Sequence, residues 1–261
     1  MKNDVDVTGV YHKNGNLLFN DITNIPIEFL DDLPDLFKEV YLVSAYIPSG
    51  KLSTVSREDL YKTNVELIDK ITSKYYRSRI IYCSSVSVYK IKNSDITEKD
   101  NEGGLNEYGI SKLWGEKIIE QLPDYAIVRF SSVYGIGMKL STIIPNYIKE
   151  ALSKKQITVW GSGERRQNYI HVSDAINFLI KAAGFQGNEK FLATSVDSIT
   201  NFELATIIAK LTDSKILFQG GDNSPSFSYN NNFTKSALSI QSQISIENGI
   251  IELIKWLQEK F

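Results

Sequence analysis

Several features of common protein classes are missing from this sequence. A single cysteine, Cys83, rules out an internal disulfide, and its apolar setting "IIYCSS" favours a core position over a nucleophile. No apolar run approaches the roughly 18 residues of a membrane helix, and the N-terminal "MKNDVDV" lacks the apolar core of a signal peptide. Lysine and arginine total 29 against 31 acidic residues, so nothing favours nucleic acid. We therefore expect a cytoplasmic protein without nucleic-acid or membrane partners.

A glycine-rich phosphate loop is also missing where the first residues suggest one. The stretch "VDVTGVYHKNG" (5–15) has the apolar pattern of a strand, but after Gly9 the next glycine is Gly15. Two interpretations follow from the residues: the stretch is either a first strand with an altered phosphate loop, or a different strand.

The 261 residues, of which 42% are hydrophobic, predict a doubly wound α/β fold with a buried core. Continuous apolar strands typical of a parallel sheet alternate with helical patterns. The predicted strands are 5–11, 16–22, 39–46, 78–85, 125–132 and 188–195, and the predicted helices are Ser56–Tyr75, Glu107–Gln121, Ile143–Lys154 and Ser173–Ala183.

The C-terminal part has a different composition. Thr200 and Glu203 form a capping-box pattern at the start of one helix, and Ser245 precedes a second helix with apolar spacing. The polar segment 219–233, "QGGDNSPSFSYNNNF", is predicted to be a loop between them.

Two stretches contain residues suited to proton transfer. The serines of "CSSVSVYK" (83–90) follow a buried strand, where open α/β sheets bind ligands. Tyr108 and Lys112 lie four residues apart on a predicted helix and share a face. An ammonium beside a phenol lowers the pKa of the phenol, so Tyr108 is predicted to act as a proton donor and acceptor. One such pair is expected by chance in a chain with 14 tyrosines, so the spacing alone is not specific.

Five motifs in one order give the chain a close resemblance to the extended short-chain dehydrogenase/reductase family, the nucleotide-sugar epimerases and dehydratases. They are "SSVSVY", "YGISK", "RFSSVYG" (129–135), "VWGSGERRQNYIHVSDA" (159–175) and "SIENGIIELIKWL". The resemblance covers nearly the whole chain. It implies a Rossmann-like cofactor domain with a small C-terminal α/β lobe for the substrate, NAD or NADP as cofactor, a nucleotide-diphosphate sugar as substrate, and a homodimer.

The resemblance also assigns residues, position by position, and implies no metal. The catalytic residues are Ser85, Tyr108 and Lys112. The cofactor-binding residues are Asp21, Ser44, Ala45, Asn64, Lys112, Ser132 and Val133. The substrate-binding residues are Ser87, Arg166 and Tyr169.

Two departures bear on the substrate. Lys90 stands where the family usually has glycine, and Gln167-Asn168 stand where nucleotide-sugar enzymes have Arg-Asp. The family's arginine grips the substrate diphosphate. The sequence leaves open whether Arg166 takes that role or is a solvated turn residue, and the alternation in "NYIHV" favours packing for Tyr169 and His171.

The resemblance also decides between the two interpretations of the opening stretch. It is followed within a few residues by "NLLFNDIT", which matches the family's third strand, so "VDVTGVYHKN" is predicted to be the second. The first strand, its glycine loop and its helix, roughly 30 residues, are then predicted to be missing. The predicted cofactor domain comprises 1–134 with 169–194, and the substrate lobe comprises 135–168 and 195–261.

Two functions remain open at this stage. One is an NAD(P)-dependent epimerase, dehydratase or reductase of a nucleotide sugar, impaired by the absent phosphate loop. The alternative is a non-catalytic descendant that binds a ligand or partner. Ile110 and Trp114 face away from Tyr108 and Lys112, which predicts a dimer through the helices Ser56–Tyr75 and Glu107–Gln121.

Overall fold

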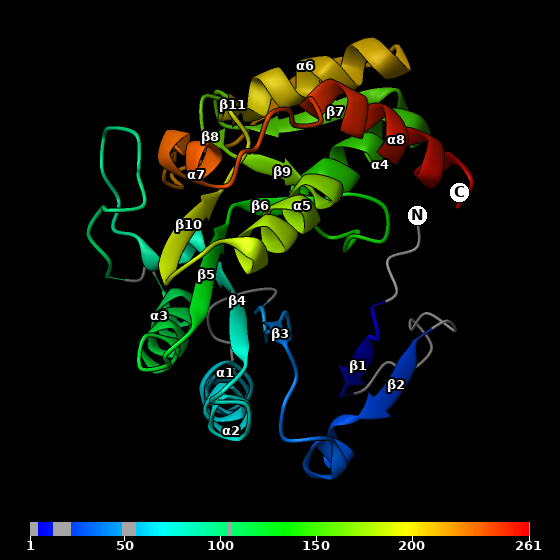
Figure 1. Ribbon diagram of the computed structural model, residues 1–261. Helices are drawn as coiled ribbons and strands as arrows, with labels where there is room; N and C mark the ends of the chain where they lie inside the picture. Colours follow the sequence, from blue (N-terminus) through cyan, green and yellow to red (C-terminus); the bar gives the residue numbers. More distant parts are fainter. Residues whose placement is uncertain (1–4, 13–21, 49–55, 104–105, 261) are drawn as a thin grey trace. The chain divides into compact units, whose positions relative to one another are not determined.

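The computed structural model describes residues 5–12, 22–48, 56–103 and 106–260 and divides into units 1–37 and 38–261 (Figure 1). In the first unit, β1 (Thr8–Tyr11) pairs in parallel with β2 (Thr23–Pro26), and a 3₁₀ helix, η2 (Ile27–Asp32), follows. The strand predicted at 16–22 and the predicted cofactor residue Asp21 fall on 13–21, outside the described residues. The strand that the structure shows begins later, at Thr23.

The second unit is built on a four-stranded parallel sheet with the order β10-β5-β4-β3. Its strands are β3 (Glu39–Leu42), β4 (Arg79–Ser85), β5 (Tyr125–Phe130) and β10 (Glu189–Ala193). All four lie inside predicted strands, so the α/β class with a parallel sheet is confirmed. The predicted absence of a first strand-and-helix unit stays a prediction.

Helices cover both faces of this sheet (Figure 1). Alternate residues of β4 point to opposite faces: Tyr82 points toward Gly115 of α3 (Glu107–Ile119), whereas Ile81 packs with Phe178 of α5 (Val172–Gly184). Because the strands are buried on both faces, their sequences are continuously apolar rather than alternating. The helices predicted at 107–121 and 173–183 are confirmed to within two residues.

The helix predicted over 56–75 is interrupted. Ser56 caps α1 (Arg57–Tyr61), a π-helical segment (Lys62–Glu66) follows, and α2 (Leu67–Lys74) completes the stretch. A π segment widens one turn and turns its side chains relative to a regular helix. It contains Asn64, which is fully buried.

Most of the remaining elements build a second core, whereas α7 (Asn232–Ala237) lies against β10 of the main sheet. Three short strand pairs are present: β6 (Ser132–Tyr134) with β9 (Tyr169–His171), β7 (Gln156–Trp160) with β12 (Lys215–Gln219), and β8 (Arg166–Gln167) with β11 (Ile199–Thr200). The other helices are α4 (Ile143–Lys154), α6 (Asn201–Thr212) and α8 (Ile246–Gln258).

A hydrophobic cluster joins α4, β7, α6 and α8, separate from the cluster of β4, β5 and α5. The capping box of Thr200 and Glu203 and the Ser245 cap are confirmed. The predicted boundaries of the cofactor and substrate domains, at 134 and 168, stay predictions.

A buried ion network connects α3 to the sheet. Arg129 of β5 and Glu116 of α3 are both fully buried, and the guanidinium donates to the two carboxylate oxygens over 2.9 and 2.6 Å. Glu102 also contacts Arg129, and Lys190 of β10 lies 2.7 Å from Glu102. These cations hold the pKa of Glu102 down at about 2 despite its partial burial. The acidic groups gathered here are therefore balanced by basic ones.

Candidate functional site

The predicted site residues lie where the parallel strands end. Ser44 and Ala45 follow β3, Ser85 ends β4, and Ser132 begins β6 directly after β5. Tyr108 and Lys112 lie in the first half of α3, which packs on β4. Parallel strands end at one edge of the sheet, so the fold collects these residues there.

Tyr108 and Ser85 form a hydroxyl pair. The Ser85 side chain is close enough to Tyr108 to act on the pKa of the phenol. The Ser85 hydroxyl donates to the Ser87 hydroxyl at 3.2 Å and accepts the Ser87 backbone N–H at 3.2 Å. Burial raises the pKa of Tyr108, and Ser85 lowers it only in part. The sequence predicted that Lys112 lowers this pKa; that prediction is wrong, because burial dominates and Lys112 is not among the groups that shift it. Tyr108 is therefore a neutral phenol at pH 7.

Lys112 is almost fully enclosed, with 1% of its surface exposed. Its Nζ lies 4.1 Å from the centroid of the Tyr82 ring. Burial lowers the pKa of Lys112 to about 8, opposed by the negative charge of Glu116 and by Cys83. The ammonium form still predominates at neutral pH, so a positive charge is held inside the fold next to the predicted reaction site.

Asn64 fixes the loop after β3. Its amide oxygen accepts the Tyr46 N–H at 2.8 Å, and its amide nitrogen donates to the Tyr46 carbonyl at 3.0 Å and to the Ser111 hydroxyl at 2.9 Å. Ser111 in turn donates to the Tyr108 carbonyl at 2.8 Å. Asn64 was predicted to contact the cofactor, but the polar atoms of its side chain form hydrogen bonds with other parts of the protein. It positions the loop of Ser44 and Ala45 against α3.

A cavity of about 150 Å³ opens beside the ends of β4 and β5. Three serines line it, and two aromatic rings form one wall: Phe227 and Tyr229, stacked with their centroids 6.5 Å apart. The full lining is Val86, Ser87, Ser131, Ser132, Arg165, Gln167, Asn168, Phe227 and Tyr229. The predicted residues Ser87 and Ser132 therefore share a cavity, and Val133 lies exposed next to it in the chain.

The cation of this cavity is Arg165, which the sequence did not single out. Arg165 donates from Nε to the Pro225 carbonyl at 3.3 Å and lies 3.7 Å from Asp222. Arg166 does not line the cavity: its guanidinium donates to the Ser198 carbonyl at 2.9 Å. Neighbouring residues of a strand point to opposite sides, so the choice between the two arginines depends on strand register.

Tyr169, predicted to contact the substrate, packs in the interior. Its side chain is 7% exposed, lies in the core cluster of α4 and α6, and packs edge-on against Tyr134. His171 is also buried, and its Nδ1 accepts the Ser173 N–H at the start of α5. Both side chains therefore pack in the interior, and substrate contact by Tyr169 stays a prediction. Cys83 is likewise packed, with burial raising the pKa of its thiol to about 12.

Solved structures of other proteins share this fold. UDP-glucuronic acid 4-epimerase from Bacillus cereus, solved with UDP-glucuronic acid and NAD, matches with a TM-score of 0.83 over 98% of this chain and 92% of its own, at 19% identity. MoeE5, solved with the same two ligands, matches with a TM-score of 0.83 at 20% identity over 98% of this chain and 92% of its own. The Rossmann-like fold is therefore confirmed.

Curated relatives are somewhat more similar in sequence and differ in coverage. A UDP-N-acetyl-alpha-D-glucosaminuronate decarboxylase of Bacillus cytotoxicus is 25% identical over 95% of this chain and 86% of its own length. An uncharacterized UDP-glucose epimerase of Bacillus subtilis is 28% identical over 40% of this chain, and the match spans only 34% of that relative.

A family model matches most of the chain. It matches residues 1–191, which include the sheet, the hydroxyl pair and Lys112. The chain belongs to the NAD dependent epimerase/dehydratase family.

Proposed function

We propose that this chain is an NAD-dependent enzyme that epimerises or dehydrates a nucleotide sugar. The observation that carries the proposal is the Tyr108–Ser85 hydroxyl pair beside the enclosed ammonium of Lys112, at the strand ends and next to a polar cavity. Relatives and structural neighbours with nucleotide-sugar substrates in their names support the substrate class.

The residues present fit one half of the cofactor. Among the described residues, Lys112 has no hydrogen bond or ion pair, so its ammonium is available to a ribose hydroxyl of the nicotinamide half. The small residues Ser44 and Ala45 leave space after β3. The diphosphate is different: no Gly-x-x-Gly-x-x-Gly spacing occurs anywhere in the sequence, and such loops normally supply the backbone amides that bind it.

The chemistry assigned to the side chains is proton transfer. NAD, when bound, takes a hydride from a sugar carbon and can return it. As a phenolate, Tyr108 accepts the proton of the hydroxyl on that carbon. As a phenol, it returns a proton to the same oxygen. Ser85 orients the phenol of Tyr108 and the sugar oxygen toward each other. Because burial raises the pKa of Tyr108, its phenol is protonated at rest and can donate that proton. To remove a proton from the sugar hydroxyl, Tyr108 must first lose its own.

Arg165 is the proposed contact for the substrate diphosphate. It is the cationic side chain of the cavity lining, and the neighbouring Gln167 and Asn168 are neutral. A guanidinium pairs with phosphate oxygens through charge-assisted hydrogen bonds. Asn168 has its amide bound to Ser195 and Asp197, so it shapes the wall.

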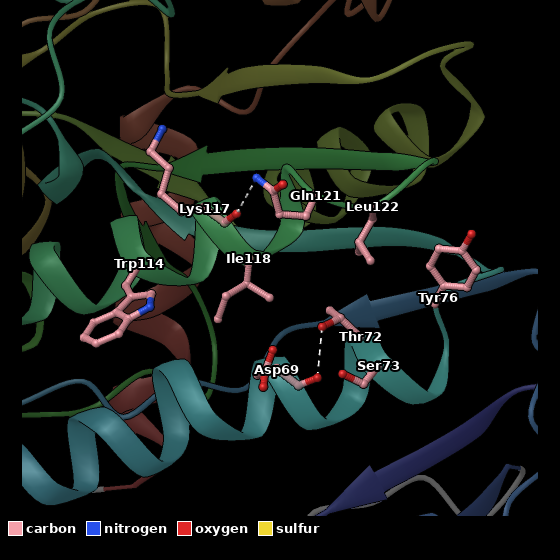
Figure 2. Close-up of a pocket in the computed structure, with 9 residues that line it drawn as sticks. All are labelled: Asp69, Thr72, Ser73, Tyr76, Trp114, Lys117, Ile118, Gln121 and Leu122. Atoms are coloured by element: carbon pink, nitrogen blue, oxygen red, sulfur yellow. Dashed lines mark hydrogen bonds between the residues drawn. The ribbon is translucent and has the colours of Figure 1, made fainter.

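The proposed dimer surface is a groove between α2 and α3 (Figure 2). Trp114 of α3 lies at its edge and is 53% exposed, as is Ile110 one turn away. Tyr61 packs edge-on against Trp114 at 5.8 Å, and Tyr76 forms another part of the rim. Large exposed apolar side chains on neighbouring helices are typical of an interaction site, and a second copy offers the same surface in return.

The helices of the described residues include none with the length and apolarity needed to cross a bilayer. Placement in the cytoplasm stays a prediction of the sequence.

We expect Tyr108→Phe to lower turnover of a UDP-sugar by roughly 10² or more, because a positioned proton donor contributes at least that much. The assay uses millimolar NAD and follows product formation. Calorimetry should show UDP-glucose binding unchanged, since the ring remains. Unchanged turnover in the variant would remove Tyr108 from the mechanism.

Arg165→Ala should weaken UDP-glucose binding by about 10- to 100-fold, the effect of losing one charge-assisted contact of about 1.5–3 kcal/mol. Arg166→Ala is the matched control, since the adjacent guanidinium binds a backbone carbonyl instead. Titration calorimetry measures both. A loss confined to Arg166→Ala would reverse the assignment.

The 261-residue chain should bind NAD with a dissociation constant of about a millimolar or weaker. Two missing charge-assisted contacts at about 2 kcal/mol each turn micromolar affinity into millimolar. Calorimetry with NAD and NADP is the measurement, and the activity of the chain alone should be correspondingly low. A micromolar constant would show that another segment binds the diphosphate.

Trp114→Glu should produce monomers, because a carboxylate in the α2–α3 groove opposes burial against a second copy. Trp160→Glu is the control: Trp160 is equally exposed, at 53%, but lies on β7. Sedimentation velocity at micromolar concentration reports both. A monomeric parent chain contradicts the proposal.

A further inference from the structure

The ammonium of Lys112 has unusual surroundings for a buried charge. Buried lysines normally pair with a carboxylate or donate several hydrogen bonds. Lys112 is 1% exposed, and among the described residues its closest charged or π partner is the face of the Tyr82 ring, 4.1 Å from Nζ to the centroid. Tyr82 is itself fully buried on β4.

The nearest acid is unavailable to Lys112. Glu116 lies one turn further along α3, at the spacing of a helical ion pair. Both of its carboxylate oxygens are taken by Arg129, and one also accepts the Ser84 hydroxyl. Because the Glu116 carboxylate is occupied by the ion network of α3 and β5, the Lys112 ammonium contacts the Tyr82 ring instead.

A glycine allows the ring to reach that position. A Cβ on Gly115 would lie 2.3 Å from the Tyr82 hydroxyl oxygen and 2.9 Å from its ring carbon Cζ. Any larger residue would push the ring or the helix away. Gly115 follows Lys112 by three residues, so the close approach of α3 to β4 occurs directly beside the ammonium.

The hydroxyl of Tyr82 does not account for the presence of a tyrosine at this position. It is buried without a hydrogen-bond partner among the described residues. An unpaired buried hydroxyl costs stability, so the useful part of this side chain is its aromatic face.

We propose that Tyr82 is the positioning residue for Lys112: its ring face holds the ammonium in place and in its charged form next to the Tyr108–Ser85 pair. The inference rests on the proposed function, in which Lys112 acts as the site's cation. A ring face attracts a cation most strongly where water is excluded. The other groups that act on the ammonium are Cys83 of β4 and Glu116 of α3.

The test measures the Lys112 pKa directly, by carbon-13 NMR of labelled lysine side chains assigned with Lys112→Arg. Tyr82→Phe keeps the ring and should leave this pKa within a few tenths of a unit. Tyr82→Leu removes the ring and should lower it by about one unit, since cation–π attraction of a desolvated pair is worth roughly that much.

A graded series keeps the test valid if Tyr82→Leu does not fold. Phenylalanine, 4-fluoro- and 3,4,5-trifluorophenylalanine at position 82 have nearly one shape but a progressively weaker ring face, so the pKa should fall stepwise. The same series at Tyr89, whose ring lies 4.7 Å from the Arg129 guanidinium, is the control and should leave Lys112 unchanged. A flat response at position 82 overturns the inference.

Turnover separates this inference from the proposed function. The NMR measurement needs neither NAD nor activity. If no UDP-sugar is converted but the pKa falls along the series, the ring positions the lysine and the proposed function fails. If conversion occurs, the pH at which activity is lost should move with the Lys112 pKa, whereas a merely structural role would lower the rate without moving it.

Discussion

The buried pair of Glu116 and Arg129 is the constraint on which the site depends. It joins the middle of α3 to the end of β5 without access to water. Such pairs seldom add much net stability, but breaking one is costly because an unpaired charge is left inside. Their geometry is therefore strongly fixed. Tyr108 and Lys112 lie on the same helix as Glu116. The Glu116–Arg129 pair therefore fixes how far along the strands they lie relative to Ser85.

Regions governed by local chemistry were predictable from the sequence. The four strands of the main sheet, the helix limits and the Thr200 capping box follow from apolar runs and from caps within a few residues. Their signals do not depend on distant contacts. The same holds for the shared face of Tyr108 and Lys112, which helical spacing determines.

Properties that depend on surroundings were not predictable. Spacing brought Lys112 near Tyr108 but gave no sign that burial would raise the pKa of the phenol or that an aromatic ring would face the ammonium. The π segment around Asn64 has no periodic signature. The choice of Arg165 over Arg166 turned on a strand of two residues, too short for a pattern. The aromatic wall at Phe227 and Tyr229 comes from a segment with loop composition.

That segment has a consequence for how such a protein can diversify. Residues 226–230 cross from β8 to the loop before α3: the Ser226 hydroxyl accepts the Arg166 N–H, and Ile96 bonds on both sides of Tyr229. The side chains proposed to react come from the sheet and α3, whereas this wall comes from a separate crossing segment. Substitutions in this segment can reshape the cavity while leaving the proposed acid–base groups untouched. The ligand preference of such a fold can therefore change through a segment that the proposed reacting groups do not constrain.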